Sequence, residues 1–264
     1  MLRLAKVLFS IALLLGMLAG ATLAHAGTPG KQLAATRPSL EAVAEEASYR
    51  EPNFGKTGQY RILRPSAAAS RDSLGVLAYF HGSGGGPTYA QQFQKLAEIA
   101  TRFNLVPLAV QAPSHAETWA ESADGPPKGH AYYAQALLDQ AVFAKSPALT
   151  RRRSVFVGVS AGSTFLSGDF LPAYGQHYGG GAVLLCGGGR PLHSATAGGA
   201  AVGLRFLFMI QRGDFLYAQT LDAVNFWEAL KVPAELRVMD GSGHCAFDTH
   251  AAMLQGIRSV LSEK

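Results

Sequence analysis

A short apolar run that leads directly into a glycine-flanked serine is the feature that most constrains this chain. Residues 154–159 read Ser-Val-Phe-Val-Gly-Val and predict a buried strand, and Ser160 follows within Gly158-Val159-Ser160-Ala161-Gly162. Glycines on either side let the chain turn sharply from strand to helix, because neither carries a side chain. Such a turn raises the serine hydroxyl above the sheet edge, beside the free N–H groups of the next helix. The pattern indicates a nucleophilic serine; the alternative is a glycine-rich turn without a chemical role.

The first 26 residues have the pattern of a secretory signal peptide. Arg3 and Lys6 precede an apolar run from residue 7 to residue 18, and Ala24-His25-Ala26 supplies small residues for a cleavage site. The run lacks the length of a stable membrane anchor, although an uncleaved anchor is the alternative. We therefore expect an exported protein, periplasmic or extracellular, in which residues 27–264 form a single domain.

The net charge says little about partners. The formal net charge is +5, and two of the positive charges lie in the leader. The main basic cluster, Arg151-Arg152-Arg153, precedes the strand at 154–159, and active sites of open parallel sheets form at the opposite edge. We expect a solvated loop there and no nucleic-acid partner. The oligomeric state stays open.

Apolar strands alternate with amphipathic helices from residue 76 onward, which is typical of a mostly parallel sheet covered on both faces. Further upstream, residues 59–64 alternate like a half-exposed strand, and Ala42, Glu45 and Glu46 suggest a short helix. The downstream strands are expected at 76–80, 105–110, 154–159, 182–186, 204–210 and 235–239, with helices near 93–103, 134–142, 221–230 and 253–261.

A nucleophilic serine needs a histidine base and an acid at the same edge of the sheet. His244 directly follows the last predicted strand and is the candidate base, ahead of His115, which precedes the serine in the chain. Asp214 follows the preceding strand and is the candidate acid. Its rival Asp240 lies only four residues before His244, where it suits a turn better.

A glycine-rich loop follows the strand at 76–80 and reads His81-Gly82-Ser83-Gly84-Gly85-Gly86. Glycines let a backbone approach a negatively charged oxygen closely. We expect an oxyanion hole formed by the N–H groups of Ala161 and Ser83, with Gly84 as the second choice for Ser83. His81 is expected to stabilise the loop. A phosphate-binding role is excluded, because no Gly-Lys-Ser/Thr follows, and no cofactor is expected.

Together these motifs resemble those of the α/β-hydrolase superfamily, over nearly all of residues 27–264. The resemblance rests on His81-Gly82-Ser83-Gly84-Gly85, the Ser160 motif, Asp214 and Gly243-His244. It implies an α/β-hydrolase fold and hydrolysis of carboxylic esters through an acyl-serine intermediate. A secreted chain without a lid is most similar to polyhydroxyalkanoate-depolymerase-like, feruloyl-esterase-like and acetyl-xylan-esterase-like carboxylesterases. A peptidase or amidase of the same fold, or a non-catalytic binding protein, is the alternative.

The interval between Cys186 and Leu204 is short and begins Gly187-Gly188-Gly189-Arg190-Pro191, so no amphipathic lid helix is expected. An open cleft would suit short acyl groups, aryl esters or a polymeric ester. Trp119 and Tyr217 are candidates to line it, and core packing is the alternative for both.

The chain has two cysteines, and both are expected at the active-site edge of the sheet. Cys186 ends a predicted strand and Cys245 follows His244. In an exported protein they could form a disulfide, worth roughly 4 kcal/mol in the chain-entropy model; two buried thiols are the alternative. No metal site is expected, because a fourth ligand is missing.

Overall fold

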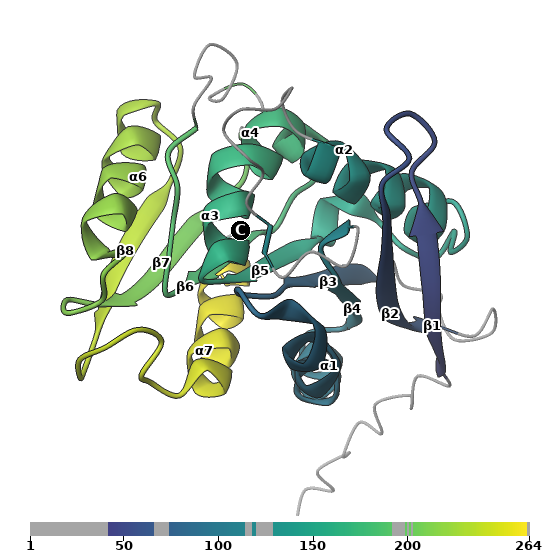
Figure 1. Ribbon diagram of the computed structural model, residues 1–264, viewed down its shortest axis with the longest axis horizontal. Helices are drawn as coiled ribbons and strands as arrows, with labels where there is room; N and C mark the ends of the chain where they lie inside the picture. Colours follow the sequence, from purple (N-terminus) through teal and green to yellow (C-terminus); the bar gives the residue numbers. More distant parts are fainter. Residues whose placement is uncertain are drawn as a thin grey trace, which may run out of the picture. The chain divides into compact units, whose positions relative to one another are not determined.

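The central feature of the computed structural model is one eight-stranded sheet with the order β1-β2-β4-β3-β5-β6-β7-β8 (Figure 1). The structure describes residues 42–65, 74–113, 118–119, 129–191, 199, 201 and 203–262, so the expected leader and His115 lie outside it. The strands are β1 (Ala42–Arg50), β2 (Thr57–Pro65), β3 (Gly75–Phe80), β4 (Leu105–Val110), β5 (Val155–Val159), β6 (Gly181–Leu185), β7 (Phe206–Gln211) and β8 (Ala234–Met239).

The six strands from β4 to β8 in this order are parallel, and only β1 and β2 run antiparallel to their neighbours. Every residue of β3, β4, β6 and β7 is buried, as the continuous apolar runs predict for strands covered on both faces. The expected fold class, a mostly parallel sheet with flanking helices, is confirmed.

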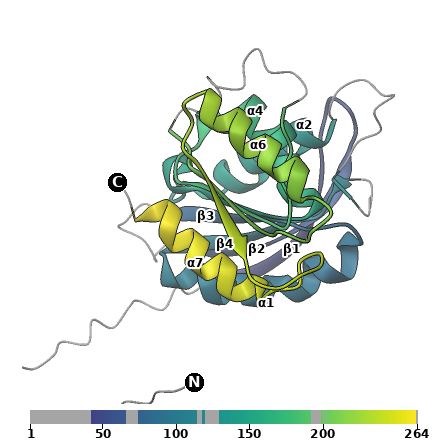
Figure 2. The ribbon, with the colours of Figure 1, turned by 90° about the vertical axis from the view of Figure 1, so that its left-hand side faces the viewer.

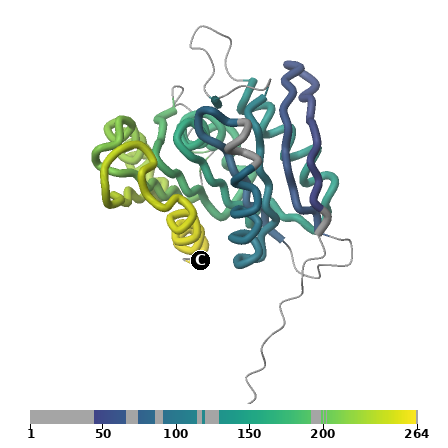
Figure 3. Tube along the Cα trace, turned by 60° about the horizontal axis from the view of Figure 1, so that its bottom comes forward, coloured from purple at the N-terminus to yellow at the C-terminus, as the bar shows by residue number. Residues whose placement is uncertain are grey.

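Helices cover the sheet in two layers (Figures 2 and 3). One core contains Ile99 of α1 and Ile257 of α7, and the other contains Phe165 of α3 and Trp227 of α6. Each layer therefore buries one face of the same strands. The helices are α1 (Gly85–Arg102), α2 (Gly129–Ala136), α3 (Ala161–Phe165), α4 (Leu171–Tyr174), α6 (Tyr217–Ala229) and α7 (Thr249–Leu261), with π-helical segments at Leu137–Phe143 and Leu166–Phe170 and 3-10 turns at Arg151–Arg153 and Gly175–His177.

The short helix suggested by Ala42, Glu45 and Glu46 is wrong, because β1 occupies these residues. β1 pairs with β2 along its whole length in a hairpin. Glu45 accepts a hydrogen bond from the Tyr60 hydroxyl at 2.8 Å and forms an ion pair with Arg64, both across the hairpin. Cross-strand pairing has overridden the local helix preference of alanine and glutamate.

Other features at the two edges of the sheet agree with the sequence pattern. Arg151–Arg153 forms an exposed turn before β5, and Arg151 pairs with Asp139 at 2.7 Å. At the opposite edge, the carboxyl ends of β3, β5, β6, β7 and β8 deliver the loops that form the candidate site. Within the described residues, no helix is long and apolar enough to cross a membrane.

Candidate active site

Ser160 occupies a strained turn between β5 and α3. Its backbone has φ 52° and ψ −114°, a conformation that non-glycine residues rarely adopt. A Cβ added at Gly158 would lie 2.6 Å from the Cα of Ser163, and one added at Gly162 would lie 2.2 Å from the carbonyl oxygen of Phe80. Only glycine fits at both positions, so the turn at Ser160 has the geometry expected of a nucleophile elbow.

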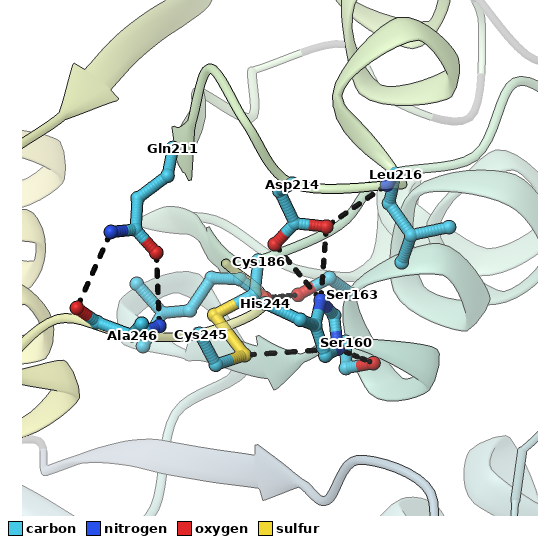
Figure 4. Close-up of polar contacts among 10 residues, drawn as sticks. Ser160, Ser163, Cys186, Gln211, Asp214, Leu216, His244, Cys245 and Ala246 are labelled. Atoms are coloured by element: carbon cyan, nitrogen blue, oxygen red, sulfur yellow. Dashed lines mark hydrogen bonds and ion pairs between the residues drawn. A yellow bond between two sulfur atoms is a disulfide. The ribbon is translucent and has the colours of Figure 1, made fainter. Parts of the chain in front are cut away.

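Ser160, His244 and Asp214 form a continuous chain of hydrogen bonds (Figure 4). His244 Nε2 lies 2.8 Å from Ser160 Oγ, and His244 Nδ1 lies 2.9 Å from both carboxylate oxygens of Asp214. An imidazole that donates its Nδ1–H to Asp214 leaves Nε2 free to accept the proton of the serine hydroxyl. The arrangement has the geometry required to activate a serine.

Burial differs sharply along this chain of hydrogen bonds. The Asp214 side chain is 0% exposed, whereas that of His244 is 31% exposed. Asp214 Oδ1 also accepts a hydrogen bond from the backbone N–H of Leu216 at 2.9 Å, which fixes the carboxylate. The rival acid Asp240 is exposed, and its backbone carbonyl accepts a hydrogen bond from Gln211. The structure therefore places Asp214, and not Asp240, against the histidine.

The loop that carries His244 is attached to the sheet at two points. Gln211, fully buried at the end of β7, bonds to the carbonyls of Asp240 and Ala246 and to the N–H of Ala246. Cys245 forms a disulfide with Cys186 at the end of β6, with a Cα–Cα distance of 5.2 Å. The sequence suggested the disulfide; the role of Gln211 was missed, because a polar residue ending an apolar strand carries no specific signal.

The glycine-rich loop after β3 lies against the elbow, since a Cβ at Gly82 would be 3.3 Å from the Cβ of Ser160. His81 is fully buried behind it: Nδ1 donates to the Gly82 carbonyl at 2.6 Å, and Nε2 accepts the Ala112 N–H at 3.0 Å. Burial lowers the pKa of His81, which matches this neutral ring. His81 therefore holds the loop.

The donors expected for an oxyanion lie at the ends of two segments beside Ser160. Ala161 is the first residue of α3, so its N–H has no acceptor within the helix. Ser83 and Gly84 follow Gly82 and are exposed. Gly84, at φ 85°, forms the N-cap of α1. The structure thus brings both segments to Ser160, with Ser83 the first candidate donor and Gly84 the second.

Of the two aromatic residues expected to line the cleft, Trp119 is placed differently. Its side chain is 0% exposed and stacks on Phe165 with the ring centroids 4.7 Å apart, so the indole is part of the core. The expectation was wrong because large apolar side chains on neighbouring elements offered the ring a buried site. Tyr217 is half-buried at the start of α6, with the Arg212 guanidinium 5.6 Å from its ring centroid.

An aromatic residue that the sequence analysis missed lies beside the histidine. The Phe215 side chain is 75% exposed, and its ring centroid is 4.5 Å from that of His244. The available signal was its position directly after Asp214, in a loop at the active-site edge.

Among the described residues, no three His, Cys, Asp or Glu side chains are grouped to hold a metal ion. The expected absence of a lid concerns the interval between Cys186 and Leu204, of which residues 192–198, 200 and 202 lie outside the described part, so it stays an expectation.

Comparison with known proteins identifies the fold. No protein-family model and no curated protein sequence matches the chain. Solved structures do match. An S-formylglutathione hydrolase from Staphylococcus aureus has a TM-score of 0.60 at 16% identity, over 83% of this chain and 99% of that one. A bacterial heroin esterase has a TM-score of 0.61 at 15% identity, over 84% and 86%. A carboxyl esterase from Tuber melanosporum has a TM-score of 0.59 at 18% identity, over 87% and 90%. The chain has the α/β-hydrolase fold.

Proposed function

We propose that this chain is an exported serine hydrolase that cleaves carboxylic esters. The observation that carries the proposal is the unbroken chain of hydrogen bonds from Ser160 through His244 to the buried Asp214. The solved structures similar in fold include several esterases, one of them a ferulic acid esterase, which supports ester chemistry with esters of aromatic acids among the substrates.

The residues suggest a two-step reaction. Ser160 Oγ attacks the ester carbonyl as its proton passes to His244 Nε2, and Asp214 stabilises the resulting imidazolium through Nδ1–H. The carbonyl oxygen gains a negative charge that the N–H groups of Ala161 and Ser83 stabilise. The carbon–oxygen bond to the alcohol then breaks, and His244 donates its proton to the departing alcohol.

The second step releases the acid. A water molecule loses a proton to His244 Nε2 and attacks the acyl carbon. The bond to Ser160 Oγ breaks, His244 returns the proton to Ser160, and the carboxylic acid leaves. Every proton in both steps passes through one nitrogen, which is the one placed 2.8 Å from Ser160 Oγ.

Export is part of the proposal. The signal-like leader and the Cys186–Cys245 disulfide support it, because structural disulfides persist in oxidising compartments. Amino-terminal sequencing of the exported protein tests this directly: the mature chain should begin at Gly27. A chain retained with its leader attached would contradict it.

The test of the catalytic assignment is the Ser160→Ala variant. It should fold, fail to react with a fluorophosphonate probe, and hydrolyse p-nitrophenyl butyrate about 10⁴-fold or more slowly. Ser48→Ala, an exposed serine on β1, is the matched control and should retain full activity. Full activity in Ser160→Ala contradicts the assignment. A wild-type protein that the probe does not label would indicate a binding protein, and faster turnover of peptides than of esters would indicate a peptidase or amidase.

A further inference from the structure

The Phe215 ring is an exposed apolar surface beside the candidate base His244. Phe215 is 75% exposed, and its ring centroid lies 4.5 Å from that of His244, with an angle of 43° between the ring planes. Single exposed apolar side chains are common on proteins, and the turn between β1 and β2 has one in Phe54. Phe215 differs from such residues because its ring packs against the group that moves the proton in the proposed reaction.

The backbone on both sides of Phe215 is held in place. The Asp214 N–H donates to the Gln211 carbonyl at 3.1 Å, and the Asp214 carbonyl accepts the Tyr217 N–H at 3.0 Å, so the chain forms a hydrogen-bonded turn with Phe215 at its second position. The Leu216 N–H donates to Asp214 Oδ1 at 2.9 Å. The turn that buries the acid therefore also fixes the aromatic ring beside the base.

The proposed reaction decides which portion of an ester comes closest to His244. His244 Nε2 donates its proton to the oxygen of the departing alcohol, so that oxygen has to come within hydrogen-bond distance of Nε2. The carbonyl oxygen of the ester points instead toward the N–H groups of Ala161 and Ser83. The first carbon atoms of the alcohol portion therefore lie beside the imidazole ring, and Phe215 packs against that same ring.

A second apolar group borders the nitrogen that transfers the proton. Cys245 Sγ, in the disulfide with Cys186, lies 4.0 Å from His244 Nε2 (Figure 4). An aromatic ring and a sulfur atom offer at most weak hydrogen bonds. An apolar group on the substrate would remove the exposed Phe215 ring from water, which is favourable, whereas a charged group would lose hydration there without gaining a partner.

We propose that Phe215 is a specificity-determining residue that contacts the alcohol portion of the ester and selects apolar alcohols, above all aromatic ones. The inference rests on the proposed esterase function and assigns Phe215 to one side of the scissile bond. A second aromatic ring pairs favourably with phenylalanine in edge-to-face or offset geometry. The acyl portion lies on the other side of the carbonyl carbon, so the preference among acyl groups should not depend on Phe215.

The test compares esters that differ on one side of the scissile bond. Benzyl acetate against ethyl acetate varies the alcohol portion and forms the same acetyl-enzyme, and methyl phenylacetate against methyl acetate varies the acyl portion. Wild-type enzyme should prefer benzyl acetate, expressed as the ratio of the two kcat/KM values. Phe215→Ala should lower this alcohol ratio by about fivefold or more, because it removes the ring contact, and should leave the acyl ratio within about twofold of wild type.

Two matched variants serve as controls. Phe215→Tyr keeps the ring and should keep the alcohol ratio. Phe54→Ala removes an exposed ring that contacts Tyr132 instead, and it should change neither ratio. If all four esters slow equally in Phe215→Ala, the ring only supports His244 and the proposal is wrong. A fall in the acyl ratio alone overturns it, as does a wild type without a preference for benzyl acetate.

Acyl transfer gives a second measurement, which needs no variant. An alcohol that replaces water in the second step loses its proton to His244 Nε2 as its oxygen attacks the acyl carbon; the bond to Ser160 Oγ breaks, and the proton passes to Ser160. With p-nitrophenyl acetate as donor and equal concentrations of benzyl alcohol and ethanol, wild type should form more benzyl acetate than ethyl acetate. Equal yields overturn the proposal. Wild-type protein that cleaves none of these esters, nor p-nitrophenyl butyrate, refutes the esterase function itself.

Discussion

Gln211 binds Ala246 through both ends of its side-chain amide. Oε1 accepts the Ala246 N–H at 2.9 Å, and Nε2 donates to the Ala246 carbonyl at 3.3 Å (Figure 4). Nε2 also donates to the Asp240 carbonyl at 2.8 Å. Asp240 and Ala246 flank the segment that carries His244. One buried amide therefore holds both ends of the histidine loop against β7.

Replacing Gln211 with glutamate should impair catalysis more than binding. The carboxylate would face two carbonyl oxygens and lose both Nε2 donors, so the histidine loop would lose its attachment. We expect kcat for p-nitrophenyl butyrate to fall at least tenfold with KM changed less than about threefold, and fluorophosphonate labelling of Ser160 to slow in parallel. The control is Gln140→Glu, which makes the same amide-to-carboxylate change at a residue that accepts a hydrogen bond from the Tyr49 hydroxyl and does not touch the histidine loop. A purely structural role would lower the melting temperature with labelling of the folded fraction unchanged.

Removing the Cys186–Cys245 disulfide should lower both stability and activity. The bridge joins residues 59 positions apart and is worth about 4 kcal/mol in the chain-entropy model. For a domain of this size that corresponds to a fall in melting temperature of roughly 10 °C. Because Cys245 directly follows His244 in the chain, loss of the disulfide should also loosen the histidine, and ester turnover should fall as well. Dithiothreitol should reproduce both effects in the wild type and should have no effect on a Cys186→Ser/Cys245→Ser double variant. If dithiothreitol also lowers the stability or activity of the double variant, the disulfide is not the cause of the loss.

The burial of His81 should make the stability of the folded protein depend on pH. Burial lowers its pKa in the folded protein below the ordinary value of 6.5, so the unfolded chain binds the proton more readily. The stabilisation is present above pH 6.5 and is lost as the pH falls from there through the pKa of the folded protein. The melting temperature should therefore drop between pH 7.5 and pH 5. His81→Gln should flatten this slope and the exposed His177→Gln should not; equal slopes in both variants would contradict the assignment.

Alanine at Gly162 should destabilise the elbow. The added Cβ would lie 2.2 Å from the Phe80 carbonyl and 2.7 Å from the His81 carbonyl, so α3 would have to move away from β3. We expect a loss of about 3 kcal/mol in the free energy of unfolding, measured by urea denaturation, together with loss of fluorophosphonate labelling. Gly199→Ala, where a Cβ meets no atom within 4 Å, is the control. Wild-type stability in Gly162→Ala would show that the helix can shift freely.

The strands and the order of the candidate triad follow from local patterns. Continuous apolar runs predicted the buried strands, and the loops at their carboxyl ends contained Ser160, Asp214 and His244, because parallel strands place those ends at one edge. Asp248 caps α7 in the same local way, because its carboxylate accepts hydrogen bonds from the N–H groups of His250 and Ala251 at the start of that helix. Each of these features depends on residues close together in sequence.

The errors concern contacts between distant segments. Glu45 and Glu46 favour a helix locally, yet they lie on β1 because β2 supplies a partner strand. Trp119 suited a cleft by its position, yet Phe80 and Phe165 form an apolar site that buries it. No local pattern shows which segments will become neighbours, so neither result was accessible from the sequence.

The amino-acid sequence by itself determined the elbow at Ser160, because glycines two residues to either side and an apolar strand before it leave the backbone few other conformations. It also restricted the acid and the base to short loops. Only the tertiary structure decided that Asp214 rather than Asp240 meets His244, that Gln211 and the Cys186–Cys245 disulfide hold that histidine, and that Phe215 lies beside it. These choices depend on distances between chain segments that are set by the packing of the whole sheet, and packing of that kind leaves no periodic or local trace in the sequence.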